Sequence, residues 1–319
     1  MDSIVINKKP KMQQFYRQIT EHYLPPYLGA QRPVNKITAE HILDMLNGMR
    51  RAEYAAQTID HVYTVGKTIL EYARKWRKIM FNPFDAVDPP EVHVVAPTPL
   101  TEAEATALLA AVADHRLHML YVLALILGLR KGELLGLTID GVHLDTASIA
   151  ITQQVLDLEG RPSIEPYTKS GHGTRTLPLT PYLVTLLHTR LAQIQAEREQ
   201  EGWAEHGLLF SSERGTPMSQ RNLDRHFKGA CVTAQIRPRI VSTNGTDGAE
   251  RATSNLRFHH LRHTCLSWLG DTGANKSIIQ AVAGHAAADV TDRYVHVSLA
   301  AVREAIERMA GAKLLKDAQ

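Results

Sequence analysis

A proline-rich stretch without helical periodicity divides this chain of 319 residues into two parts. It runs from Asn82-Pro83 through Pro89-Pro90 to Pro99, and this composition is typical of an exposed linker between domains. The chain is longer than most single domains, and 44% of its residues are hydrophobic, which is enough for two cores. We therefore expect a first domain over residues 1–90, a linker over residues 91–98 and a second domain over residues 99–319.

Composition excludes several classes of protein. The two cysteines, Cys231 and Cys265, form neither a CxxC zinc motif nor a disulfide framework, which fits a reducing compartment. No signal-peptide pattern opens the sequence, and no apolar run is long enough to span a bilayer. A net charge of +3 permits a nucleic-acid partner without requiring one. We expect a cytoplasmic protein with no membrane partner.

The first part of the chain contains a long amphipathic helix, expected over residues 57–80. Apolar or small residues recur at steps of three and four, which predicts one buried face: Ile59, Val62, Gly66, Ile69, Ala73, Trp76 and Met80. Lysines and arginines occupy the other side, and the candidates for contacting a phosphate backbone are Lys67, Arg74, Lys75 and Lys78. A solvated helix surface is the alternative reading of the same charges.

The second part is mainly helical and contains a short β-rich stretch. Thr101 and Glu104 form a capping box that predicts a helix start. Further helices are expected over residues 119–127, 130–135, 181–200, 219–235, 260–269, 276–283 and 301–309. β-Branched, alternating segments predict strands over residues 149–155, 163–168 and 175–179, the last two joined as a hairpin by the turn at residues 170–173. The polar segment 241–255 predicts a mobile loop. Arg251 and Arg257 are candidate DNA contacts, but a plain surface insertion is the favoured interpretation.

Three short motifs concentrate side chains that could act on a phosphodiester. In the first, Arg130 follows an apolar helix and Glu133 lies one turn later. In the second, His259 and Arg262 are three residues apart and share one helical face. In the third, His285 precedes Tyr294 by nine residues. Each motif by itself is weak, so the inference depends on their occurrence together.

The chemistry of these residue types suits attack on a DNA backbone. Guanidinium groups match the non-bridging oxygens of a phosphate, so Arg130 and Arg262 could neutralise the transition state without a metal ion. A tyrosine hydroxyl has an ordinary pKa of about 10, so it needs a base or positive potential to become a nucleophile at neutral pH. Histidine and paired arginines supply both.

The order of these residues resembles the complete active-site set of the tyrosine recombinase, or phage integrase, family. The sharpest motifs are LGLRKGELLGL, HHLRHT and GHAAADVTDRYVHV, with PYTKSGHGTRTLPL between the first two, and the likeness covers roughly residues 98–310. All six positions of the set are filled: Arg130, Lys169, His259, Arg262, His285 and Tyr294. The resemblance implies a mainly α fold, with a helical, SAM-like core-binding domain and a mainly helical catalytic domain that carries a small antiparallel β-sheet.

The resemblance also implies a reaction that requires no cofactor. Tyr294 would attack the scissile phosphate, giving a 3′-phosphotyrosyl enzyme and a free 5′-hydroxyl. Arg130 and Arg262 would hold the phosphate, and His259 would handle the tyrosine proton. Lys169, on a β-hairpin in the family, would protonate the leaving oxygen, and His285 would donate a hydrogen bond to the phosphate. Glu133 and His263 would support these groups, whereas His260 stands where the family often carries an acidic residue and has no assigned role.

The resemblance further implies double-stranded DNA as the partner and four protomers on two recombination sites, in a bacterial cell or phage-infected host. The helix expected over residues 301–309 could pack on a neighbouring protomer or against the rest of its own chain. The segment before Phe15 leaves no room for the separate arm-binding domain of many phage integrases. We therefore expect either a simpler recombinase or a trimmed N-terminus.

Three other functions remain open on the sequence. A type IB topoisomerase would share the phosphotyrosine chemistry but relax DNA instead of exchanging strands. A catalytically silent regulator would only occupy a DNA site, and a metal-dependent nuclease would need a cation. His259 and His263 have the spacing of two zinc ligands, but there is no obvious third ligand. The sequence favours a site-specific recombinase from a phage or other mobile element, and it does not reveal the target DNA or the biological outcome of recombination.

Overall fold

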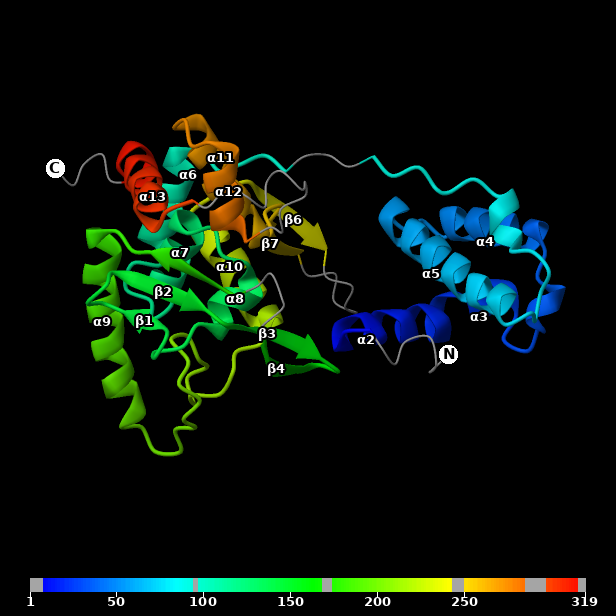
Figure 1. Ribbon diagram of the computed structural model, residues 1–319, viewed down its shortest axis with the longest axis horizontal. Helices are drawn as coiled ribbons and strands as arrows, with labels where there is room; N and C mark the ends of the chain where they lie inside the picture. The colour runs from blue at the N-terminus through cyan, green and yellow to red at the C-terminus, as the bar shows by residue number, and fades with distance from the viewer. Residues whose placement is uncertain (1–7, 94–96, 168–173, 243–249, 285–296, 315–319) are drawn as a thin grey trace. The chain divides into compact units, whose positions relative to one another are not determined.

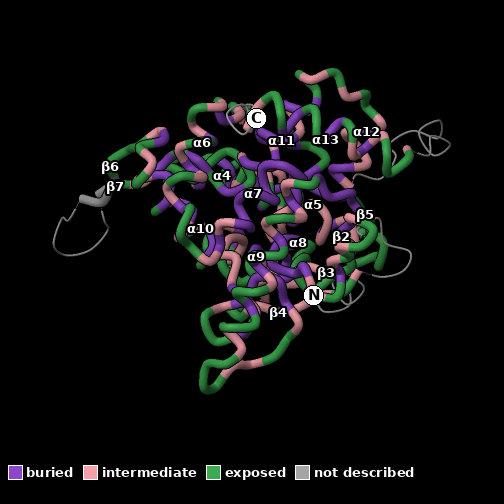
Figure 2. The backbone as a smooth tube through the Cα atoms, turned by 90° about the vertical axis from the view of Figure 1, so that its left-hand side faces the viewer, coloured by how far each residue is buried: buried purple, intermediate pink, exposed green. Residues whose placement is uncertain are grey.

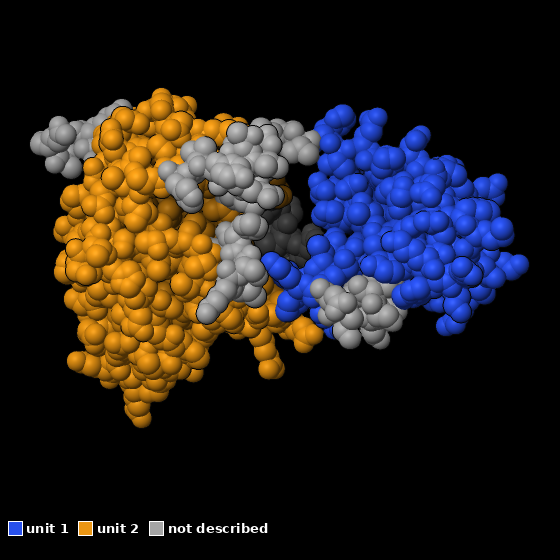
Figure 3. Space-filling view, in the orientation of Figure 1, with its two compact units in different colours: residues 1–96 blue, residues 97–319 orange. Residues whose placement is uncertain are grey.

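The computed structural model describes every residue except 1–7, 94–96, 168–173, 243–249, 285–296 and 315–319. The chain divides into two compact units, residues 1–96 and residues 97–319, which Figure 3 colours separately. The division falls within the stretch 91–98. Over the described residues, none of the helices combines the length and the apolar character that crossing a bilayer requires.

Unit 1 is built from short helices around two longer ones. Its elements are α2 (Pro10–Gln18), η1 (Ile19–Tyr23), α3 (Pro25–Leu28), η2 (Val34–Lys36), α4 (Ala39–Arg51), α5 (Ala56–Lys75) and η3 (Pro83–Ala86). Thr38 caps α4 by accepting a hydrogen bond from the His41 backbone N–H. The Tyr63 hydroxyl on α5 donates to the carbonyls of Phe84 and Val87, so the segment after α5 is fastened back onto that helix.

The long helix α5 ends earlier than its sequence pattern predicts. Arg77 adopts a positive φ of 56°, and the Lys78 backbone N–H returns to the Ala73 carbonyl at 2.9 Å, which closes the helix at Lys75. The predicted buried face is therefore wrong at its end: Trp76 is 49% exposed and Met80 is 92% exposed. The earlier positions of that face, from Ile59 to Gly66, are buried.

Unit 2 wraps helices around one apolar helix. Its helices are α6 (Glu102–Ala111), α7 (His118–Ile126), α8 (Lys131–Gly136), α9 (Pro181–Arg198), α10 (Gln220–Thr233), α11 (His259–Asp271), α12 (Lys276–Ala283) and α13 (Leu299–Lys313). Every residue of α7 from Met119 to Ile126 is buried, and Figure 2 shows this helix inside the unit. The predicted capping box of α6 is confirmed, because Thr101 and Glu104 exchange hydrogen bonds of 2.8 and 3.1 Å.

The described strands of unit 2 form one three-stranded sheet and two separate two-stranded pairs. They are β1 (Val142–His143), β2 (Ser148–Ile151), β3 (Gln153–Leu158), β4 (Arg161–Pro166), β5 (Arg175–Pro178), β6 (Pro238–Ser242) and β7 (Glu250–Ser254). All described pairs are antiparallel, with sheet order β1-β2-β5 and separate pairs β3-β4 and β6-β7. The predicted class, mainly α with small antiparallel sheets, is confirmed (Figure 1).

Two expectations about these strands are wrong. The hairpin expected between β4 and β5 does not form, because β4 pairs with β3 across the two-residue turn Glu159-Gly160 while β5 pairs with β2. Both turn residues have positive φ, at 50° and 81°, which matches the twist of a tight hairpin. The loop expected over residues 241–255 is wrong at its two ends, because residues 241–242 and 250–254 lie in the paired strands β6 and β7. Residues 243–249 lie outside the described residues.

Helix α8 lies directly against strand β3, because two glycines face that strand. A Cβ atom at Gly132 would come within 2.8 Å of the Val155 carbonyl oxygen, and one at Gly136 within 2.7 Å of the Gln154 Cα. The sequence KGELLG therefore allows two backbones to touch. This contact fixes the start of α8, where Arg130 is located.

Candidate active site

Arg130 and Glu133 are held together at the start of α8. The Glu133 carboxylate accepts the Arg130 backbone N–H at 2.8 Å and the Arg130 Nη1 at 2.9 Å. Glu133 therefore satisfies an unpaired N–H at the helix start and also orients the guanidinium of the preceding residue. The Glu133 side chain has no solvent exposure, whereas that of Arg130 is 37% exposed. The Arg130 side chain is therefore partly accessible to a ligand from solvent.

A second arginine binds the same carboxylate. The sequence did not identify this arginine as functional. Arg175 at the start of β5 donates Nη1 to Glu133 Oε1 at 3.0 Å and Nη2 to Oε2 at 2.9 Å. Its side chain is only 10% exposed. The only sequence signal for it was its place in the RTLPL segment, which does not indicate a partner 42 residues away.

The pKa of Glu133 reflects these contacts. Burial raises the pKa, but the hydrogen bonds and charge of Arg175, together with the hydrogen bonds from Arg130, outweigh burial and lower it to about 2. The carboxylate is therefore ionised at neutral pH and can hold two guanidinium groups. The Tyr167 hydroxyl is at 3.4 Å from Oε1 on the same carboxylate.

Arg262 projects from α11 into the interior of unit 2. It is 4% exposed and donates Nη1 to the Gly128 carbonyl and Nη2 to the Ala283 carbonyl, both at 2.7 Å. Burial and the nearby charge of Arg130 lower its pKa to about 10, so it remains a cation at neutral pH. Arg262 thus ties the segment before Arg130 to the last turn of α12, which in sequence directly precedes Gly284 and His285.

The histidines of α11 lie at its first turn. His259 lies at the surface of unit 2, and desolvation by its neighbours, together with the charges of His263, Arg262 and Arg130, lowers its pKa to about 4. It is therefore neutral at pH 7 and can accept a proton. The His259 and His263 rings meet edge to face with centroids 4.8 Å apart. His260 accepts the Arg257 backbone N–H on its Nδ1 at 2.9 Å, a local contact at the helix start.

Three of the predicted site residues, Lys169, His285 and Tyr294, lie outside the described residues. The described ones, Arg130, Glu133, His259, Arg262 and His263, come together from the start of α8 and the first turns of α11. Their charges act on one another, because Arg130 lowers the pKa of both His259 and Arg262. The six-residue catalytic set as a whole stays a prediction.

The basic residues expected on the first domain are only partly available. Lys67 forms an ion pair with Asp85 at 3.0 Å, and Arg74 forms one with Glu71 at 2.7 Å. Lys75 lies over the Tyr72 ring, with its Nζ 5.5 Å from the ring centroid. Lys78 lies beyond the end of α5. Acidic neighbours therefore reduce the positive potential that the sequence pattern suggested.

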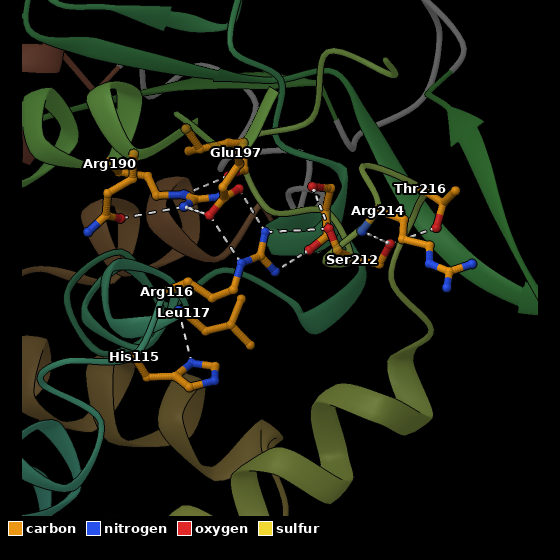
Figure 4. Close-up of polar contacts among 11 residues, drawn as sticks. His115, Arg116, Leu117, Arg190, Glu197, Ser212, Arg214 and Thr216 are labelled. Atoms are coloured by element: carbon orange, nitrogen blue, oxygen red, sulfur yellow. Dashed lines mark hydrogen bonds and ion pairs between the residues drawn. The ribbon is translucent and has the colours of Figure 1, made fainter. Parts of the chain in front are cut away.

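Among the described residues of unit 2, two carboxylates each bind a pair of arginines, and the two clusters differ in the solvent exposure of those arginines. Glu197 of α9 binds Arg116 and Arg190 with hydrogen bonds of 2.7 to 3.1 Å (Figure 4). Both of these guanidinium groups also donate to backbone carbonyls, and Arg190 is 1% exposed. We therefore interpret this cluster as structural, because its hydrogen bonds join α9 to other segments of unit 2. In the Glu133 cluster, the side chain of Arg130 is 37% exposed, against 20% for Arg116, the more exposed arginine of the Glu197 cluster.

Comparison with known proteins gives one consistent result. Residues 99–300 match the phage integrase family. An integrase from Streptomyces ambofaciens is 27% identical, covering 86% of this chain and 68% of that protein. The tyrosine recombinase XerD from Pseudomonas aeruginosa is also 27% identical, covering 84% of this chain and 80% of the relative.

Solved structures with the same fold include two integrases that were determined on DNA. The Tn1549 transposon integrase in complex with transposon right end DNA has a TM-score of 0.73 at 20% identity, covering 97% of this chain and 96% of that one. A lambda integrase dimer bound to a core site has a TM-score of 0.62 at 17% identity, covering 93% and 95%. At these identities the structural likeness establishes the fold, and the match over residues 99–300 establishes the family. The chain therefore belongs to the phage integrase family of tyrosine-type site-specific DNA recombinases.

Proposed function

We propose that this recombinase cleaves and rejoins DNA through a 3′-phosphotyrosyl intermediate formed on Tyr294. One observation carries the proposal: a solvent-accessible guanidinium, Arg130, and a buried one, Arg262, both lie near the neutral histidine His259. Two guanidinium groups can neutralise the charge of a pentacovalent phosphate, and a neutral imidazole can take the tyrosine proton. This division of roles gives His259 the base function.

The remaining roles are those that the resemblance to the family implies. Lys169 would protonate the leaving 5′-oxygen, and His285 would donate a hydrogen bond to the phosphate. Glu133 and His263 would hold the neighbouring groups in place, which the contacts of Glu133 with Arg130 support. The chemistry needs no metal ion, so cleavage should proceed at an unchanged rate in excess chelator.

The wider setting is also proposed. Unit 1 would act as the core-binding domain and unit 2 as the catalytic domain, with double-stranded recombination sites as the substrate. Lys67, Arg74, Lys75 and Lys78 would contact phosphates, so DNA affinity should fall steeply with salt. Four protomers would act on two sites in the cytoplasm of a bacterial cell or phage-infected host. The recombinase would come from a phage or another mobile genetic element. Family membership and the DNA-bound structural relatives support this setting.

A nicked suicide substrate tests the proposed chemistry. Cleavage beside a nick lets the short 5′-hydroxyl fragment diffuse away, so the covalent protein–DNA adduct accumulates and survives SDS. The wild-type chain should form this adduct in excess chelator, and Tyr294→Phe should bind the same DNA without forming it. An adduct formed by Tyr294→Phe, or one that requires a divalent cation, would contradict the proposal.

A further inference from the structure

Glu133 presents an electrostatic problem for the proposed phosphate site. Its carboxylate is fully buried and lies within hydrogen-bond distance of Arg130, the guanidinium that should bind a phosphate. Carboxylates and phosphates compete for the same fork of N–H donors. If Arg130 were the only partner of Glu133, the two charges would cancel and the carboxylate would occupy the donors that the phosphate needs.

Arg175 resolves that competition. It occupies both Glu133 oxygens in a bidentate fork, at 3.0 and 2.9 Å, and leaves Arg130 a single side-chain hydrogen bond to Oε1 among the described contacts. The three side chains then carry one net positive charge, and the exposed member of the cluster is Arg130 rather than Arg175. The remaining N–H groups of Arg130 can face a ligand.

Arg175 also touches the end of α12. Gly284 follows that helix with a positive φ of 61°, and a Cβ atom there would come within 2.6 Å of Arg175 Nη1 and 2.7 Å of its Cζ. The guanidinium therefore packs against the bare backbone of Gly284. Arg262 holds the adjacent Ala283 carbonyl at 2.7 Å, so two arginines from different elements support this helix end.

We propose that Arg175 is a positioning residue for strand cleavage, which neutralises Glu133 so that Arg130 keeps its charge and its donors for the scissile phosphate. The inference rests on the proposed function of the site. It assigns Arg175 no contact with DNA and no proton to transfer. Its effect on the reaction passes through Glu133 and Arg130.

The Glu197 cluster supplies a matched control for this role. Glu197, like Glu133, is a carboxylate shared by two arginines, and burial opposed by their hydrogen bonds likewise sets its pKa at about 2. Arg116 donates two hydrogen bonds to it, as Arg175 does to Glu133. None of the described contacts of Arg116 involves a residue of the Glu133 cluster. Arg116→Met therefore removes a comparable ion pair without touching the Arg130 donors.

The experiment compares Arg175→Met, Arg175→Lys, Glu133→Gln, the double variant Arg175→Met/Glu133→Gln and Arg116→Met in the full-length chain. The rate of adduct formation on a saturating nicked duplex is measured beside non-covalent DNA affinity and thermal stability. We expect Arg175→Met to slow cleavage by about 10- to 100-fold, because small displacements of a catalytic group have costs of this size. Its DNA affinity should stay within about twofold of the wild type, since phosphate contacts elsewhere dominate binding.

The double variant separates positioning from simple loss of structure. The double variant removes the positive charge of Arg175 and the negative charge of Glu133, so the cluster keeps one net positive charge, as in the wild type. Arg130 then has no carboxylate beside it. The double variant should therefore cleave about tenfold faster than Arg175→Met. Arg175→Lys keeps the charge but loses the fork, and it should fall between wild type and Arg175→Met. The inference is overturned if Arg175→Met cleaves like wild type, if the double variant is no faster, or if Arg116→Met slows cleavage equally.

A second readout does not depend on cleavage. In a crystal structure of Arg175→Met, both Glu133 oxygens should be bound by the Arg130 guanidinium, and a retained single contact would overturn the inference. If the wild type forms no adduct, the proposed function fails, while this structural outcome still decides whether Arg175 controls Arg130.

Discussion

Replacing Gly136 with alanine should force α8 away from β3. The new Cβ would lie 2.7 Å from the Gln154 Cα and 2.8 Å from the Gln153 carbonyl oxygen, and these are backbone atoms that no rotamer change can move. Ordinary contact begins near 3.4 Å, so the backbones must separate by about 0.7 Å, the difference between 3.4 and 2.7 Å. Overpacking of this kind costs about 1–3 kcal/mol. For a unit of this size, the midpoint of thermal unfolding should fall by about 2–12 °C.

The same displacement should reach the site, because Arg130 directly precedes α8. A shift of this size in a catalytic group slows reactions by up to about 100-fold, so Gly136→Ala should also cleave the nicked duplex more slowly. The matched control is Gly229→Ala on α10, where an added Cβ meets no atom within 4 Å. That variant should be more stable by about 0.5–1 kcal/mol, because alanine is the better helix former, and should cleave normally. Calorimetry that found Gly136→Ala as stable as wild type would refute the packing account.

Three further outcomes are expected. Thr101→Ala removes the cap of α6 and should lower the free energy of unfolding by about 0.5–2 kcal/mol in urea titrations, whereas an unchanged midpoint would mean that the capping box contributes nothing. Glu197→Gln leaves the buried Arg190 without its carboxylate and should destabilise unit 2 by about 3–5 kcal/mol, with a loss below 1 kcal/mol arguing against a buried cluster. His259 has a folded pKa of about 4, below its unfolded value near 6.5, so its contribution to stability is full above about pH 6.5 and is lost as the pH falls toward 4. An NMR titration of its ring that gave a pKa above 6 would contradict this.

Local signals in the sequence predicted most of the helices of unit 2. The capping box at Thr101 and Glu104 predicted the start of α6, and the apolar run after His118 predicted a buried α7. The end of α5 was not predictable in the same way. Arg77 adopts a left-handed conformation without being glycine or asparagine, so no residue type marked the point where the helix stops.

Contacts between distant segments were beyond local reasoning. Strand β5 could pair with β4 through a glycine-rich turn or with β2 through the sheet, and the sequence favoured the first arrangement while the structure has the second. The Arg175–Glu133 pair depends on that choice, because it joins β5 to α8. The motifs predict which residues carry the chemistry, but the partner that balances Glu133 became visible only through the tertiary structure.

The most direct test of the central claim is to identify the amino acid joined to DNA in the SDS-resistant adduct. The adduct formed on a nicked duplex is digested with protease and nuclease, and the nucleotide-bearing peptide is sequenced by mass spectrometry. We predict a 3′-phosphate ester on Tyr294 and on no other side chain. Linkage to a different residue, or to the 5′ end of the cleaved strand, would contradict the account.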